Sequence, residues 1–202
     1  MKDLVILVAD KNMAFSIKGI LSRPQALSIR QIHFDIFIHP HHDPGCFNEG
    51  HHFLQSALNQ SGHALILFDR EGCGREDLTR EQLEQRVEHN LFRAGWQQAA
   101  AIVLDPELEI WVWNDSPHVA DILGWKNKQA DLNHWLIKKG FLQKGEIKPL
   151  KPKESMEAAL KQVRKPRSSI LYRQLAEKVS FGRCTDAAFQ KFKTTLQNWF
   201  PI

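Results

Sequence analysis

The chain has no long hydrophobic run, only three cysteines and neither of the common glycine-rich phosphate-binding motifs. Because no apolar run approaches about 18 residues, no transmembrane helix is predicted. The start, MKDLVILVADKN, lacks the basic region and cleavage site of a signal peptide and predicts a first strand. Cys46, Cys73 and Cys184 are far apart and odd in number, which favours reduced thiols in a cytoplasmic protein away from membranes. The missing GxxxxGK[ST] and GxGxxG motifs weigh against a nucleotide-binding α/β protein.

The composition is that of an ordinary globular protein with an uneven charge distribution. Of the 202 residues, 43% are apolar and 25% are charged, which excludes disorder as the main state. Residues 1–136 carry a net charge of −6 and residues 137–202 a net charge of +10. An acidic body is suited to hold a divalent cation and a basic tail to hold a polyanion, although an uneven surface charge explains the difference equally well.

Four short apolar runs alternate with helix-like segments over the first two-thirds of the chain. The runs cover residues 4–9, 32–38, 64–68 and 100–104, and three of them show no polar alternation. Such runs are typical of strands that are covered on both faces. Helical periodicity predicts helices at 10–23, at 53–59, from Asp77 or Thr79 to about Ala94, and from Pro106 onward, with a loop at 39–52.

Strands separated by helices predict an α/β fold with a mostly parallel four-stranded sheet that is flanked by helices. From about residue 126 the pattern becomes helical and basic, with helices expected at 132–139, 156–163, 170–179 and 186–199. We therefore predict an α/β core over residues 1–125 and a basic helical cap over residues 126–202 that packs on this core.

An acidic residue follows each predicted strand. These residues are Asp10 after the first strand, Asp43 after the second, Asp69 and Glu71 after the third, and Asp105, Glu107 and Glu109 after the fourth. The carboxyl ends of parallel strands meet at one edge, where ligands bind in open α/β sheets. Carboxylates gathered there repel one another unless a cation lies among them, and Mg²⁺ prefers such ligands. Aspartate is also a common turn and N-cap residue, which explains any single case but four of four poorly.

The segments LILFDREGCG (65–74) and DPELEIWVWND (105–115) resemble the acid-x-acid and Glu-x-Trp elements of small TOPRIM-like proteins of bacterial defence loci. These proteins are related to the overcoming-lysogenisation-defect nucleases. The terminal segment with Cys184, Phe189, Phe192 and Leu196 is similar as well. The chain departs from the family after the first strand, where Asp10-Lys11 stands in place of Glu-Gly.

The resemblance implies phosphodiester hydrolysis with Mg²⁺ or Mn²⁺ held by Asp69, Glu71 and Glu109, with Asp10 as a further ligand or general base. It also implies that nucleic acid is the substrate and that an ABC-type ATPase or another defence component is a partner. The departure at Asp10-Lys11 keeps a second function open, namely a non-catalytic TOPRIM-like subunit that docks on such a partner.

The segment 39–52 contains five of the ten histidines together with Asp43, Cys46 and Glu49. It matches no standard metal-ligand spacing. Three interpretations compete: His41, His42 or Asp43 joins the site at the sheet edge, these residues contact phosphate, or the segment is a solvated loop. We expect His41, His42, Asp43 and also Asp105 to be accessory site residues.

A basic segment at 161–169 is the strongest candidate for phosphate contacts. Its cations precede serine hydroxyls and the start of a predicted helix, which is a favourable geometry for anions. The residues concerned are Lys161, Arg164, Lys165 and Arg167. A basic loop that binds nothing is an equally good interpretation.

Overall fold

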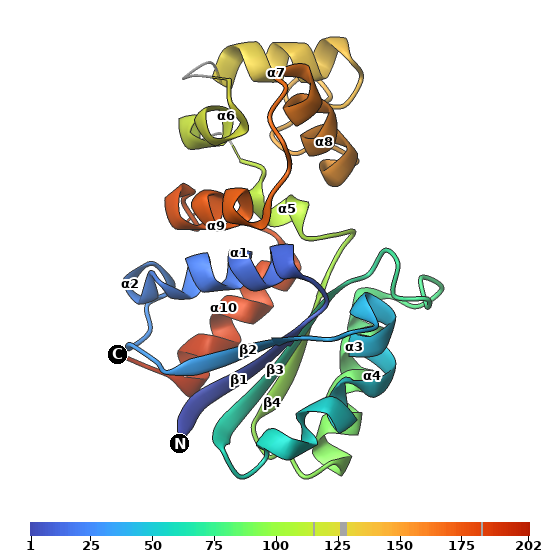
Figure 1. Ribbon diagram of the computed structural model, residues 1–202, viewed down its shortest axis with the longest axis vertical. Helices are drawn as coiled ribbons and strands as arrows, with labels where there is room; N and C mark the ends of the chain where they lie inside the picture. Colours follow the sequence, from blue (N-terminus) through green and yellow to red (C-terminus); the bar gives the residue numbers. More distant parts are fainter. Residues whose placement is uncertain (115, 126–128, 183) are drawn as a thin grey trace.

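The computed structural model describes residues 1–114, 116–125, 129–182 and 184–202, and at its centre lies a four-stranded sheet. The strands are β1 (Lys2–Val8), β2 (Phe34–Ile38), β3 (Ser61–Asp69) and β4 (Ala99–Leu104), and each pairs in parallel with its neighbours in the order β2-β1-β3-β4 (Figure 1). The predicted α/β fold with a parallel four-stranded sheet is confirmed. The carboxyl ends of all four strands therefore share one edge.

Burial along the strands follows the hydrophobic pattern of the sequence. β1, β3 and β4 each contain at least five consecutive buried residues, as expected for strands with helices on both faces. β2 is an edge strand, and Phe37 and Ile38 at its end are 44% and 41% exposed.

Helices cover both faces of the sheet. α1 (Lys11–Leu21) and α10 (Ala187–Trp199) lie on one face, and α3 (His42–Phe53) and α4 (Arg80–Arg93) lie side by side on the other (Figure 1). Two short helices, α2 (Pro24–Leu27) and the 3₁₀ helix Leu54–Ala57, extend the connections. Among the described residues, no helix is long and apolar enough to cross a membrane.

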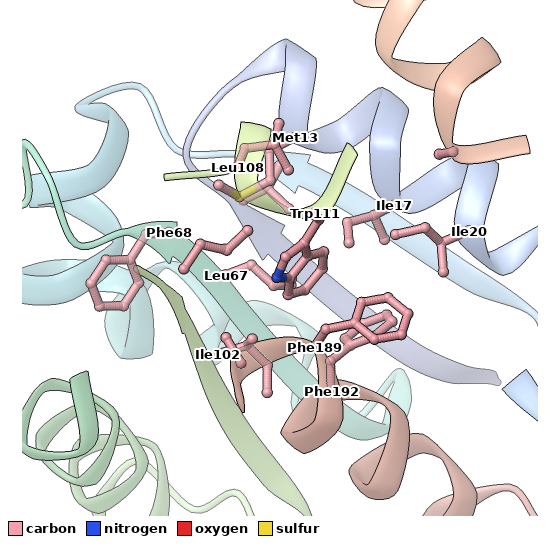
Figure 2. Close-up of a cluster of buried hydrophobic side chains, with 14 of the residues drawn as sticks. Met13, Ile17, Ile20, Leu67, Phe68, Ile102, Leu108, Trp111, Phe189 and Phe192 are labelled. Atoms are coloured by element: carbon pink, nitrogen blue, oxygen red, sulfur yellow. The ribbon is translucent and has the colours of Figure 1, made fainter. Parts of the chain in front are cut away.

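The buried cluster on the α1 and α10 face joins distant parts of the chain. Figure 2 shows Met13, Ile17 and Ile20 of α1 facing Trp111 and the rings of Phe189 and Phe192. The Trp111 ring meets Phe189 edge-on with centroids 5.1 Å apart, and its Nε1 donates a hydrogen bond of 2.8 Å to Asp186. These contacts anchor the segment after β4 to the C-terminal helix.

The C-terminal third of the chain occupies two places. α6 (Pro117–Leu123), α7 (Gln129–Lys138) and α8 (Pro152–Gln162) form a group at the end of the molecule remote from the sheet (Figure 1). α9 (Ser169–Lys178) returns to pack along α1, and α10 packs against β4. The domain boundary at residue 125 stays a prediction.

The predicted loop at 39–52 is wrong, because most of this segment forms α3. Pro44 is tolerated because it lies in the first turn, where its missing N–H has no intrahelical acceptor. The glycines serve close packing instead of turns: a Cβ on Gly45 would lie 2.0 Å from the ring of His39, and one on Gly50 would lie 2.8 Å from Ile66. Only the tertiary contacts of the helix explain these glycines.

The helix expected to start at Pro106 is also wrong. The helix in this region, α5 (Glu109–Val112), is short and begins three residues later. The Pro106 carbonyl accepts a hydrogen bond of 3.0 Å from the Glu71 amide, so the segment first runs beside the continuation of β3. This irregular segment carries Glu107 to the sheet edge before α5 begins.

Replacing Gly19 with alanine is expected to destabilise the protein by about 1–2 kcal/mol, because a Cβ there would lie 2.8 Å from both the Ala176 Cβ and the Arg173 carbonyl oxygen of α9. This overlap outweighs the roughly 1 kcal/mol that alanine gains over glycine within a helix. Urea denaturation measures the effect. Gly62→Ala is the control, since its Cβ would make only an ordinary contact of 3.7 Å. Equal stability of the two variants would contradict the close packing of α1 on α9.

Candidate functional site

Asp69, the last residue of β3, lies at the centre of a group of acidic side chains at the carboxyl edge of the sheet. Burial raises the pKa of Asp69 well above its usual range, and the neighbouring carboxylates of Asp43, Glu109, Asp10 and Glu107 raise it further. Its Oδ1 is shielded from solvent and has no hydrogen-bond partner among the described residues. The site thus contains a carboxyl group that the surrounding protein leaves unsatisfied.

Asp43 reaches Asp69 from the first turn of α3. Its Oδ1 accepts a hydrogen bond of 2.8 Å from the Asp69 backbone amide, which orients the carboxyl group. Burial raises the pKa of Asp43, and the charge of Asp10 adds to this rise. The structure therefore brings Asp43 into the acidic group, as the accessory role expected for it requires.

Asp10 lies at the end of β1 and is the N-cap of α1. Its Oδ1 accepts a hydrogen bond of 2.8 Å from the Met13 backbone amide, while Oδ2 accepts one of 3.4 Å from the Asn12 side-chain Nδ2. Lys11 is exposed, and its ammonium group lies 5.8 Å from the centroid of the Phe15 ring. Lys11 thus points to a surface aromatic ring, and no ion pair joins it to the described carboxylates.

Glu109 is buried at the start of α5 and is held by two groups from the C-terminal third of the chain. Its Oε1 accepts a hydrogen bond of 2.9 Å from Arg167 Nη2 and another from the Tyr172 hydroxyl. Arg167 Nε also donates to the Tyr172 oxygen at 2.6 Å. Burial and the charge of Glu109 raise the pKa of Tyr172, so this hydroxyl stays protonated and remains a donor.

Glu107 forms the opposite side of the group. The Lys153 backbone amide donates to its Oε1 at 3.0 Å, and Lys153 Nζ lies 3.6 Å from its Oε2. Burial and the nearby Glu109 raise the pKa of Glu107 even so. Lys153 and Arg167 therefore bring two positive charges from the C-terminal third to the rim of the acidic group.

Glu71 and Asp105 lie at the outside of this arrangement. The Glu71 side chain is exposed, and its charge contributes to the raised pKa of the neighbouring Glu107. Asp105 is exposed and lies 3.5 Å from Arg70, with which it forms an ion pair. The acid-x-acid spacing thus places one side chain inside the protein and the other at its surface.

His41 and His42 flank the start of α3. His41 is exposed and its Nδ1 lies 3.4 Å from Glu49 Oε2, whereas His42 Nδ1 lies 3.1 Å from the Ala9 carbonyl oxygen. That oxygen can only accept, so the Nδ1 of His42 carries a hydrogen. His42 holds the start of α3 against the end of β1, which helps to position Asp43.

The basic segment at 161–167 divides between surface and interior. Lys161 and Arg164 are exposed. Lys165 Nζ instead donates a hydrogen bond of 2.5 Å to the Ile122 carbonyl, and Arg167 pairs with Glu109 and, at 2.5 Å, with Glu157. The expectation that all four cations lie free for phosphate disagrees with these contacts. Lys165 and Arg167 are thus held by these acceptors of the protein itself, of which only the Glu109 carboxylate is buried.

The donor set suits Mg²⁺ or Mn²⁺ only in a water-rich site. Among the described residues, no three His, Cys, Asp or Glu side chains are arranged to ligate one ion together. Mg²⁺ usually binds one or two carboxylates and retains several waters. Asp43, which is partly exposed, and Asp69, whose unpartnered Oδ1 is shielded from solvent, supply two such carboxylates, so the waters would lie on the side of Asp43. Glu109 is engaged by Arg167 and Tyr172.

Tyr172 and Lys153 were not predicted as members of this site. The sequence does mark Tyr172, because it is the only tyrosine in the chain and lies on the apolar side of a predicted helix. A buried tyrosine hydroxyl needs a hydrogen-bond partner, which points to a nearby polar group. For Lys153 no such signal distinguishes it from its basic neighbours.

Comparison of the chain with protein-family models, with curated proteins and with solved structures found no match.

Proposed function

We propose that this protein is a Mg²⁺- or Mn²⁺-dependent phosphodiesterase that acts on nucleic acid. The observation that carries the proposal is Asp69, a strand-end carboxyl group with an unpartnered, solvent-shielded oxygen and four acidic neighbours. A divalent cation supplies the charge that this group lacks, polarises a phosphate and lowers the pKa of a bound water. Asp69 and Asp43 are the residues we assign to hold it.

The other residues of the site have assignable tasks in such a reaction. Arg167 and Tyr172 hold Glu109 in one position, so its carboxylate adds fixed negative charge beside Asp69. Asp10, which keeps its orientation through the Met13 amide, is the candidate general base. Lys153, whose Nζ lies 3.6 Å from Glu107, is the residue we assign to contact the phosphate.

The TOPRIM-like resemblance extends this proposal to a biological setting. It supports an effector of a bacterial anti-phage defence system that works in the cytoplasm with an ABC-type ATPase or another defence component. The cysteines agree with a reducing compartment, because Cys46, Cys73 and Cys184 are all free. A strand-end acid on a parallel sheet also agrees with the TOPRIM-like identity of the fold.

One observation favours the second function, a non-catalytic subunit that docks on such a partner. Asp10 caps α1 and Glu109 satisfies Arg167 and Tyr172, so both carboxylates contribute to the structure without any metal. In that case Lys153 and the acidic group would stabilise the fold and would have no catalytic role.

Incubation with supercoiled DNA, single-stranded DNA and tRNA, with Mg²⁺, Mn²⁺ or EDTA, tests the proposal. We expect cleavage that requires the cation and is lost in Asp43→Asn, whereas Glu71→Gln, outside the buried group, retains most of it. The assay is run with and without the suspected ATPase partner. Cation-independent cleavage, or none under any condition, would move the protein to the docking function.

A further inference from the structure

A groove lies between α3 and α4, and the acidic residues of α4 are engaged away from it. The acidic residues Glu84 and Glu88 of α4 point to β4, where they accept hydrogen bonds from the Val103 and Ala101 amides and pair with Lys191. Glu81 pairs with Arg80. Among the described residues, the α4 side chains that line the groove include no acid: they are amides, two arginines and a histidine, namely Gln82, Gln85, Arg86, His89, Asn90 and Arg93.

The groove consists of two adjoining hollows. The first, of about 590 Å³, lies among Phe47 and Asn48 of α3, Arg75 of the loop after β3, and the first three turns of α4. The second, of about 330 Å³, lies among His51, His52, Arg93 and neighbouring residues, and Asn90 lines both. Both hollows thus border α3 and α4, and they meet at Asn90.

The cations of this groove have few partners in the protein. Arg86 and Arg93 are exposed and form no ion pair or hydrogen bond with the described residues. The nearby Asp77 is engaged elsewhere: it forms hydrogen bonds of 2.8 and 2.9 Å with Arg75, which lower its pKa, and the charge of Arg86 adds to this effect. Free guanidinium groups beside free amides are the groups that proteins use to contact phosphate and base edges.

The groove starts beside the acidic group. α3 carries Asp43 in its first turn, next to Asp69, and Phe47 and Asn48 of the groove follow one turn later on the same helix. Arg75 follows β3 by only a few residues. A chain that lies in the groove thus extends toward the carboxylates at the sheet edge.

We propose that the α3–α4 groove binds a single strand of nucleic acid and directs its backbone to the acidic group. This inference rests on the proposed function and names the form of its substrate. Arg86 and Arg93 contact phosphates, while Gln85 and Asn90 hydrogen-bond with base edges that a duplex would conceal. The groove takes the place of the basic segment at 161–167 as the main binding surface.

Fluorescence anisotropy with labelled oligothymidylate in EDTA tests the inference without any cleavage. Arg86→Ala combined with Arg93→Ala is expected to weaken binding at least about tenfold. The slope of log K against log salt should become less negative by about 1.4, the value for two lost phosphate contacts on a single strand. The matched control, Lys161→Ala combined with Arg164→Ala, removes the same charge from the exposed basic segment and is expected to bind within about twofold of the wild type, because it removes no phosphate contact. The double Arg→Lys groove variant should retain most of the affinity.

The inference would be overturned by undetectable binding by the wild type, by a greater loss in the control than in the groove variant, or by equal affinity for polyglutamate of the same length. Tighter binding of the duplex than of the single strand would also overturn it. The experiments distinguish a failure of this inference from a failure of the proposed phosphodiesterase function. Cation-dependent cleavage with an unimportant groove leaves the phosphodiesterase standing, whereas groove-dependent binding without cleavage under any condition leaves only the binding site.

Discussion

In metal-free buffer, the Asp69→Asn protein is expected to be more stable than the wild type, and the difference is expected to grow with pH. Burial and neighbouring carboxylates raise the pKa of Asp69 in the folded protein, while the unfolded chain has the ordinary value of about 3.9. Between these two values the folded state binds more protons than the unfolded state, so the wild type loses stability as the pH rises. Asparagine does not titrate, so the Asp69→Asn protein does not show this loss of stability with rising pH.

The expected difference in unfolding free energy is small near pH 4 and reaches about 1–3 kcal/mol once the pH exceeds the raised pKa, on the scale of an unsatisfied buried polar group. Urea denaturation at a series of pH values measures it. Asp105→Asn is the matched control, because this aspartate also follows a strand but is exposed. A variant that is less stable than the wild type at pH 8 would contradict the strained environment of Asp69.

The same substitution is expected to abolish cleavage and the response to metal. Mn²⁺ at about 100 times its dissociation constant should stabilise the wild type and Asp105→Asn by about 2.7 kcal/mol, because it binds only the folded state. Asp69→Asn should show no such gain, since it lacks the carboxylate that we assign as ligand. Thermal melts with Mn²⁺ and EDTA make the comparison. Equal metal stabilisation of all three proteins would place the cation elsewhere.

Arg167→Ala is expected to destabilise the protein by about 3 kcal/mol, because it leaves the buried carboxylate of Glu109 without its charged partner. Glu109→Gln removes the charge instead and is expected to cost less, since Arg167 keeps its contacts with Tyr172 and Glu157. The double variant should therefore be more stable than Arg167→Ala alone, and urea denaturation of the four proteins completes the cycle.

Lys161→Ala provides the control for this cycle, because Lys161 is an exposed cation of the same basic segment. Its effect should stay within about 0.5 kcal/mol, as is usual for surface substitutions. An Arg167→Ala effect on the free energy of unfolding no larger than that of this control would contradict the pairing of Arg167 with Glu109. Strictly additive effects of the two substitutions in the double variant would contradict it as well.

Local patterns in the sequence were sufficient for the sheet and for the approximate boundaries of α1, α4, α9 and α10. Strands that are buried on both faces need continuous apolar runs, and such runs occur in few other places, so β1, β3 and β4 could be predicted within a few residues. The helix from Thr79 was predictable because its capping box is written in adjacent residues. The position of Asp10 and Asp69 at the carboxyl edge followed from the parallel sheet.

Contacts between distant residues decided the rest. Gly45 and Gly50 resemble turn residues in the sequence, but they lie within α3, where their missing side chains leave room for the His39 ring and for Ile66. Arg167 and Tyr172 follow Glu109 by 58 and 63 residues, and no local pattern links them. Burying the Glu109 carboxylate is costly without these donors, and they reach it because α9 packs on α1. The acidic group and the groove along α3 and α4 are likewise products of the tertiary structure.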